Sequence, residues 1–320
     1  IMANADQILS LIRCHVEGDD ERFRSLALQV SATEAKAGHV VLARSIKEII
    51  KNSKIKVLRP SFNISNSDAG EYLLQMDTPY RLADLVISDN LRNKIQRVLR
   101  EYLMRDKLHA YNLDNRRKIL MYGPSGTGKT MTASVVAAEL DLPLYVIRLE
   151  NIVTKFMGET SLKLSKVFDA MRSVPAVYFF DEFDAIGQKR DSDNEVGEMR
   201  RVLNSFLQLL ERDESESLIL AATNDKGALD KALFRRFDDI LEYSYPTVNE
   251  IEMILKEKIN GFNFEGNISD LLPLMEGMSQ AEICMVCKDA IKEVLLENRV
   301  LNLSLFKEIL SMKDRGNFAV

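Results

Sequence analysis

The stretch Gly123-Pro124-Ser125-Gly126-Thr127-Gly128-Lys129-Thr130 (GPSGTGKT) decides the fold of this 320-residue chain. It fits the pattern G-x-x-x-x-G-K-[ST], whose glycines let the backbone curl until its N–H groups point at phosphate oxygens. An apolar run, KILMY, precedes it and a helical pattern follows it, which is the context that this motif requires. We therefore predict a phosphate-binding loop, in which Lys129 reaches the β- and γ-phosphates and the Thr130 hydroxyl ligates Mg²⁺.

Outward from this loop, short apolar runs alternate with helical patterns. The expected strands are 118–122, 144–149, 176–180, 217–222 and 240–244, and the expected helices between them are 129–140, 161–173 and 195–211. Apolar strands that alternate with helices predict an α/β fold, with a parallel sheet covered by helices on both faces. Ligands of such sheets bind at the carboxyl ends of the strands.

Polar residues follow two further strands of this predicted sheet. Asp181 and Glu182 come directly after 176–180, where Asp181 is placed to hold Mg²⁺ and Glu182 to polarise an attacking water. Asn224 follows the next strand and can orient that water, although asparagine is also a common turn residue. Arg235 and Arg236 come next, as a surface pair or as a pair that stabilises phosphoryl charge in trans.

The rest of the chain has mostly helical patterns. Helices are expected over 5–16, 20–37, 39–51 and 89–107, whereas 52–80 is less regular. We predict three parts, which are a helical N-terminal domain with a linker (1–75), a large α/β domain (76–246) and a small helical domain (247–320). The first part is expected to recruit a partner.

Composition restricts the class of protein. The formal net charge of −5 argues against a protein dedicated to coating nucleic acid. The chain has three cysteines, too few for a disulfide scaffold, and no apolar run approaches the ~18 residues of a membrane span. No signal peptide is visible, so a cytoplasmic location is expected. Cys284 and Cys287 form C-x-x-C without a second ligand pair, which favours core packing over a metal site.

From Leu82 to Lys313 the chain resembles an AAA ATPase of the AAA+ superfamily. The resemblance rests on features in the family's order, which are GPSGTGKT (123–130), KFMGET (155–160), FFDEFDAIG (179–187), LAATN (220–224), LDKALFRRFD (229–238) and GMSQAEI (277–283). It implies ATP with Mg²⁺ as cofactors, ATP hydrolysis, and a ring of subunits, a hexamer in the family, with ATP between neighbours. The small C-terminal domain then forms a helical lid.

The same resemblance implies roles for single residues. Glu182 is the catalytic carboxylate, Asn224 is the sensor, and Arg235 and Arg236 reach the γ-phosphate held by the next subunit. Leu85 belongs to the segment that lines the adenine pocket. Ala281 opens a small-domain helix against the nucleotide, and Met131 completes the nucleotide-binding set. Because the arginines are adjacent, as in the severing and membrane-remodelling branches, their division of roles stays open.

The stretch Lys155-Phe156-Met157-Gly158 resembles the family's pore loop. There, an aromatic residue beside a flexible thioether grips an extended polypeptide in many registers. The polar segment 188–198 lies where the family has a second pore loop. The resemblance thus implies an unfoldase or remodeller that threads a protein through a central pore.

Several alternatives stay open. The chain can act alone on one partner fold, as HORMA-domain remodellers do, or it can feed a separately encoded protease. A nucleic-acid motor or loader would need a basic patch near the pore, where Lys155 and Lys163 flank Glu159. A GTPase would need N-K-x-D, and the stretch Asn93-Lys94-Ile95-Gln96 lacks the aspartate. A nucleotide-gated scaffold with little ATP turnover is also open, but the presence of the carboxylate Glu182 argues against it.

Overall fold

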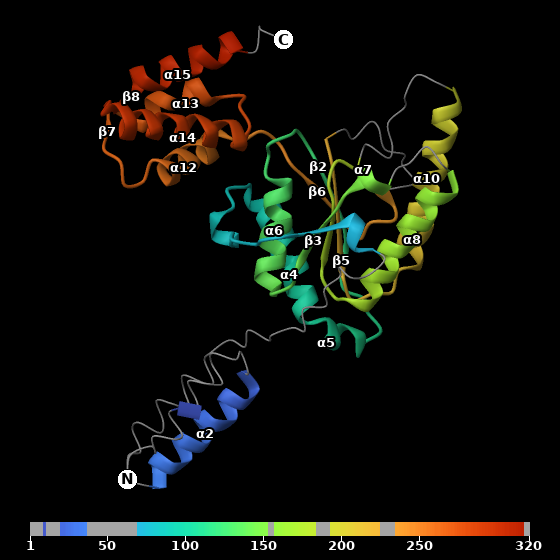
Figure 1. Cartoon of the computed structure of the whole chain (residues 1–320). Helices are drawn as coiled ribbons and strands as arrows, with labels where there is room; N and C mark the ends of the chain where they lie inside the picture. Colours follow the sequence, from blue (N-terminus) through green and yellow to red (C-terminus); the bar gives the residue numbers. More distant parts are fainter. Residues whose placement is uncertain are drawn as a thin grey trace. The chain divides into compact units, whose positions relative to one another are not determined.

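The structure, a computed structural model, describes residues 9–10, 20–36, 69–152, 157–183, 193–224 and 234–316. The chain divides into two compact units, residues 1–63 and 64–320. In the first unit the structure describes helix α2 (Asp20–Lys36), which agrees with the helix predicted over 20–37 (Figure 1). The helices predicted over 5–16 and 39–51 lie outside the described residues, except that residues 9 and 10 are helical.

A six-stranded sheet, as far as the structure describes the chain, organises the second unit. In spatial order its strands are β1 (Leu73–Met76), β3 (Leu144–Ile147), β4 (Val177–Phe180), β5 (Leu218–Thr223), β2 (Lys118–Tyr122) and β6 (Asp239–Glu242). The pairs β3–β4, β4–β5, β5–β2 and β2–β6 are parallel, as the alternation of strands and helices predicts.

Strand β1 differs from the prediction, which treated 52–80 as irregular. It pairs antiparallel with β3, with Leu73 opposite Ile147. It is an edge strand, and only its first residue is buried, although Leu74 and Met76 are apolar as well. The strand also spans the boundary predicted at 75/76, so the large sheet begins before that boundary.

Helices cover both faces of the sheet, as predicted. Successive strand residues point to opposite faces, and in β4 the residues Val177 and Phe179 join one apolar cluster while Tyr178 and Phe180 join the other. The first cluster includes α4 (Asp89–Leu103) and α6 (Lys129–Leu140), and the second includes α8 (Met157–Ser173) and α10 (Asp193–Arg212). Figure 1 shows these helix pairs on opposite sides of the sheet. Since both faces are filled, a ligand can reach the sheet only at its edges.

The C-terminal part builds a core of its own. Its helices are α12 (Val248–Lys258), α13 (Leu272–Met275), α14 (Gln280–Glu297) and α15 (Leu303–Gly316). It also contains a two-stranded parallel sheet of β7 (Phe264–Glu265) and β8 (Leu301–Asn302), which the purely helical prediction missed because two-residue strands have no periodicity. Cys287 is buried in this core and Cys284 packs against it, in agreement with their predicted packing role.

Shorter elements complete the described chain. They are η2 (Gly70–Tyr72), η3 (Leu82–Asp84), α5 (Arg105–His109), α7 (Leu149–Ile152) and η4 (Ile268–Leu271). None of the helices that the structure describes has the length and apolar character that a bilayer span requires.

Candidate active site

Residues 123–128 of the motif form the loop that connects β2 to α6, and other parts of the chain lie close to it on both sides. Gly123 has φ +149°, and a Cβ there would lie 2.2 Å from the Tyr243 carbonyl oxygen. Gly126 has φ +75°, and a Cβ there would lie 2.6 Å from Ser279 Oγ. Both positions therefore exclude side chains. The backbone curls at the N-terminus of α6, whose partial positive charge favours an anion, so the loop fits a phosphate group.

Lys129, the first residue of α6, is buried beneath this loop. Its Nζ donates to the carbonyl oxygens of Gly123 (2.7 Å) and Pro124 (2.8 Å) and to Asn224 Oδ1 (2.8 Å). Asn224 follows β5, whose end lies beside the end of β2, where the Gly123 N–H donates to the Thr223 carbonyl oxygen. The structure thus brings together the lysine and the asparagine that the sequence predicted separately.

Thr130 and Asp181 also meet at this edge of the sheet. The Thr130 hydroxyl donates to Asp181 Oδ2 at 3.1 Å, and Asp181 follows the buried strand β4. Hydroxyl and carboxylate oxygens are ligands that Mg²⁺ accepts in proteins, usually together with water and substrate phosphate. This pair of oxygens therefore fits a magnesium ion beside the phosphate loop.

Glu182 lies on the turn after Asp181 with an unusual backbone. Its φ is +48°, a left-handed conformation that costs a residue with a side chain roughly 1–2 kcal/mol. Two hydrogen bonds hold the turn, from the Glu182 N–H to Asp181 Oδ1 (2.9 Å) and from the Phe183 N–H to the Ala222 carbonyl oxygen (2.8 Å). The side chain of Glu182 is exposed, so a polar group at this edge can reach its carboxylate.

Residues from outside the sheet border the loop. The Ala281 N–H, at the start of α14, donates to the Gly126 carbonyl oxygen at 3.0 Å. Leu85 is buried, and its Cδ1 would lie 3.7 Å from a Cβ on Gly128. Met131 packs against the same apolar cluster as Leu85. The three residues predicted to complete the nucleotide-binding set therefore lie on or beside the loop or in the cluster behind it.

Tyr243 is a site residue that sequence reasoning missed. Its hydroxyl donates to Thr132 Oγ1 at 2.7 Å, and the Thr132 hydroxyl donates to the Gly128 carbonyl oxygen at 3.0 Å. Burial raises the pKa of the Tyr243 phenol, while the hydrogen bond to Thr132 lowers it by less. This chain of contacts ties the end of β6 to the loop. The only signal in the sequence was an aromatic residue near the end of a predicted strand.

Arg235 and Arg236 lie at the opposite edge of the sheet. They precede β6, which is parallel to β2, so that Asp239 pairs with Ile119 and Glu242 with Tyr122. The arginines are therefore near the start of β2, whereas the phosphate loop follows its end. At roughly 3.3 Å per residue, the five residues of β2 separate them by about 16 Å. Within one chain, the structure does not bring the arginines to Lys129.

Half of the predicted pore loop lies within the described residues. Lys155 and Phe156 lie outside them, as do residues 188–192, whereas 193–198 belong to α10. Met157 and Gly158 belong to the first turn of α8, which begins four residues before the helix predicted from 161. The predicted loop at these two positions is thus a helix start.

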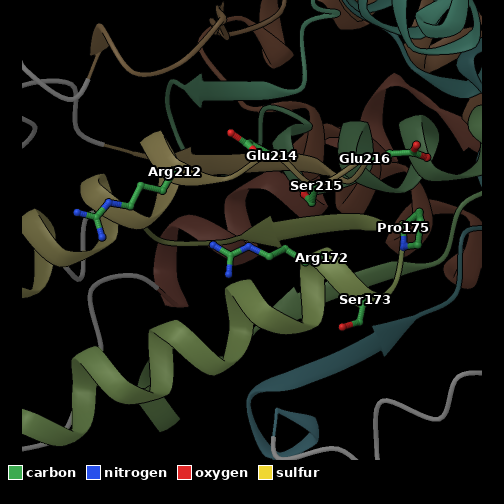
Figure 2. Close-up of a pocket in the computed structure, with 7 residues that line it drawn as sticks. All are labelled: Arg172, Ser173, Pro175, Arg212, Glu214, Ser215 and Glu216. Atoms are coloured by element: carbon green, nitrogen blue, oxygen red, sulfur yellow. The ribbon is translucent and has the colours of Figure 1, made fainter.

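A pocket lies at the amino edge of the sheet, at the opposite end of the strands from the phosphate loop, and no predicted site residue lines it. Its volume is about 590 Å³, and it is lined by Arg172, Ser173, Pro175, Arg212, Glu214, Ser215 and Glu216. Figure 2 shows Arg172 and Arg212 at the ends of α8 and α10. Cations at helix C-termini offset the helix dipoles, which accounts for both arginines without a ligand.

Comparisons with known proteins found relatives that match most of this chain. A family model, "ATPase family associated with various cellular activities (AAA)", matches residues 119–245. The "Uncharacterized AAA family ATPase y4kL" of Sinorhizobium fredii is 33% identical over 304 residues, which cover 93% of this chain and 91% of that protein. The proteasome-activating nucleotidase of Sulfurisphaera tokodaii is 32% identical over 272 residues, which cover 77% of this chain and 69% of that protein.

Two further matches were found. The ATP-dependent zinc metalloprotease FtsH of Mycoplasmopsis synoviae is 35% identical over 208 residues, which cover 62% of this chain and 31% of that protein. The crystal structure of the FIGL-1 AAA domain has a TM-score of 0.63 at 21% identity, covering 79% of this chain and 92% of that one. This last likeness shows that the two chains share a fold.

Proposed function

Because the chain belongs to the AAA family of ATPases, we propose that it hydrolyses ATP as a ring of its own copies and uses that energy to unfold or remodel a protein. The observation that carries the catalytic part is the convergence at the carboxyl edge of the sheet. There, Lys129 reaches Asn224, and Thr130 reaches Asp181.

Each residue at this edge has a role that follows from its chemistry. The loop N–H groups and the Lys129 ammonium bind the phosphates of ATP, and Thr130 and Asp181 hold Mg²⁺. The metal supplies positive charge that offsets the charge developing on the phosphates. Asn224 orients the attacking water, and the Glu182 carboxylate accepts its proton. Leu85, Met131 and Ala281 border the nucleotide.

A ring follows from the placement of the arginines. Arg235 and Arg236 lie about 16 Å from the phosphate loop of their own chain, along β2. An arginine that stabilises phosphoryl charge must contact the phosphate itself. We therefore infer that they serve the ATP bound by a neighbouring subunit, so that hydrolysis depends on assembly, with a hexamer as the expected ring.

The protein substrate is inferred from similarity and from the pore motif. One relative is named as a nucleotidase that activates a proteasome, and another as an ATP-dependent protease. In this chain, Phe156 with Lys155, Met157 and Gly158 is the proposed grip on the polypeptide. The N-terminal part, residues 1–75, is the proposed recruiting domain. The names of these relatives also favour a second candidate, a motor that feeds a separately encoded protease.

A substrate trap tests the proposal. Glu182→Gln is expected to bind ATP without hydrolysing it, and so to hold its partner. It would be purified from native cells with saturating ATP beside the Glu182→Gln/Phe156→Ala control. A protein retained only when Phe156 is present supports remodelling, and co-purified protease subunits favour the second candidate. Nuclease-sensitive nucleic acid retained in place of protein would contradict the proposal.

A further inference from the structure

The two adjacent arginines lie in a turn that is anchored by their neighbours. Phe237 is buried in the apolar cluster beneath α8 and α10, and Phe234 packs against the same cluster. The Asp238 carboxylate accepts hydrogen bonds from the backbone N–H groups of Arg117 and Lys118, both at 2.9 Å. The turn is thus fixed to the core on both sides and to the start of β2.

Arg236 has an anchor of its own. Its Nε lies 2.6 Å from Oε1 of Glu211, near the end of α10, and the Arg236 side chain is only 29% exposed. Arg235 is exposed. These contacts fix the residues on both sides of Arg235. The guanidinium of Arg235 itself stays at the surface.

The segment that carries Glu211 is itself tied to the sheet. Two residues on, the Asp213 carboxylate is buried and pairs with the Arg117 guanidinium. The Ser215 hydroxyl donates to the same carboxylate at 3.0 Å, and Arg117 also donates to the Asp213 carbonyl oxygen. Glu211 is therefore held on a segment that is fixed to β2, the strand whose other end carries the phosphate loop.

Resting on the proposed function, we propose that Glu211 is a positioning residue for hydrolysis in the neighbouring subunit. It holds Arg236 within its own chain and neutralises its charge. Arg235 is then the arginine that contacts the neighbour's γ-phosphate, and Arg236 sets the direction in which Arg235 points. The two arginines thus have different roles, which their adjacency in the sequence conceals.

The decisive variant exchanges the charges of the pair, as Glu211→Arg/Arg236→Glu. If Arg236 only positions, the exchanged pair still forms and the ring retains its kcat within a few-fold. If Arg236 itself contacts phosphate, the exchange leaves a glutamate there and turnover is lost. Assembly is checked by size-exclusion chromatography with ATP.

A double-mutant cycle gives a second measurement that does not depend on the exchanged pair folding. Glu211→Ala and Arg236→Ala are each expected to lower kcat about 10- to 100-fold through misplacement of Arg235, with the KM for ATP nearly unchanged. The double variant is expected to be no slower than either single variant. Glu214→Ala removes a like charge from the adjacent pocket (Figure 2) and is the matched control, with unchanged kcat.

The outcomes separate this inference from the proposed function. Arg235→Ala is expected to lower kcat by roughly 10³-fold or more. If Arg235→Ala retains full turnover, the trans arginine of the proposed function is wrong. If Arg235→Ala is inactive but Glu211→Ala is fully active, or the losses of Glu211→Ala and Arg236→Ala multiply, the positioning role alone is wrong.

Discussion

At the carboxyl edge of the sheet, side chains from three segments meet within hydrogen-bonding distance, since Lys129 contacts Asn224 and Thr130 contacts Asp181. At the amino edge, charged side chains pair among themselves, as Arg117 does with Asp213 and Arg236 with Glu211. The first edge has the groups to bind a nucleotide, whereas the second fixes the turn that carries Arg235.

This contrast explains why one chain would be an incomplete enzyme. Strand β2 joins the two edges, with the phosphate loop at its end and the arginine turn beside its start. A rigid sheet keeps the two edges apart, so under the proposed function the arginines complete a site only when another copy provides it. Four substitutions at the carboxyl edge, each paired with a control elsewhere in the chain, test this contrast in order of expected effect.

The largest effect is expected from Glu182→Gln at the carboxyl edge. Loss of a general base costs about 10²- to 10⁴-fold in rate, so kcat is expected to fall by that factor. ATP affinity, measured by equilibrium binding, is expected to stay within a few-fold. Glu214→Gln at the amino edge is the control with unchanged kcat. Normal turnover by Glu182→Gln would mean that Glu182 is not the general base.

Lys129→Ala is expected to weaken ATP binding by about 100-fold, because a buried charged donor to phosphate is lost. Lys118→Ala removes the same charge from the other end of β2 and is expected to leave the affinity unchanged. Titration with a fluorescent ATP analogue at subunit concentrations that disfavour assembly measures both. Equal losses in the two variants would mean that net charge, rather than placement, determines binding.

Gly126→Ala is expected to combine backbone strain with a clash. The added Cβ would lie 2.6 Å from Ser279 Oγ at a φ of +75°, which together cost about 1–3 kcal/mol of stability. Gly261→Ala has similar strain, at φ +90°, with nothing within 4 Å of the new Cβ. Thermal unfolding of both variants separates strain from clash. Equal losses would mean that the loop does not contact Ser279.

The smallest effect concerns alkaline pH and Tyr243. Burial raises the pKa of Tyr243 and of Tyr178, whereas tyrosines of the unfolded chain ionise near pH 10. Their contribution to stability is therefore complete below about pH 9 and is lost as the pH rises above 10, since the unfolded state then binds fewer protons.

The variant Tyr243→Phe tests the predicted loss of stability at alkaline pH. At pH 8 the variant loses the hydrogen bond to Thr132, worth about 1 kcal/mol, and its melting temperature is expected to fall less steeply between pH 9.5 and 11. Tyr111→Phe, at an exposed position, is the control with unchanged slope. An unchanged slope in Tyr243→Phe would mean that this phenol is accessible to solvent.

Much of the carboxyl edge was predictable, because one rule covers it. Buried parallel strands appear as apolar runs, and the polar residues that follow them meet at one edge. Asp181 and Asn224 were found in this way, and the motif fixed Lys129 and Thr130. The ends of strands were predicted less accurately. The strand predicted over 144–149 ends at Ile147, and Leu149 begins α7.

The amino edge was not predictable, because its contacts join residues far apart without a motif. Arg117 and Asp213 are 96 positions apart, and the acidic run after 210 has the composition of a solvated helix end. Strand β1 was not predicted, because only Leu73 of its four residues is buried. The role of Tyr243 was not predicted, because the tertiary fold brings its hydrogen-bond partner Thr132 to it from a distant part of the sequence.

Mixing two inactive variants tests most directly whether the two edges act together across subunits. Glu182→Gln keeps Arg235 but lacks the base, and Arg235→Ala keeps the base but lacks the arginine. In mixed rings, the arginine of the first variant can serve the intact site of the second. ATPase activity of the mixture well above the sum of the separate variants is the predicted result. Activity no greater than that sum, in rings shown by differential tags to contain both variants, would contradict a site completed by a neighbour.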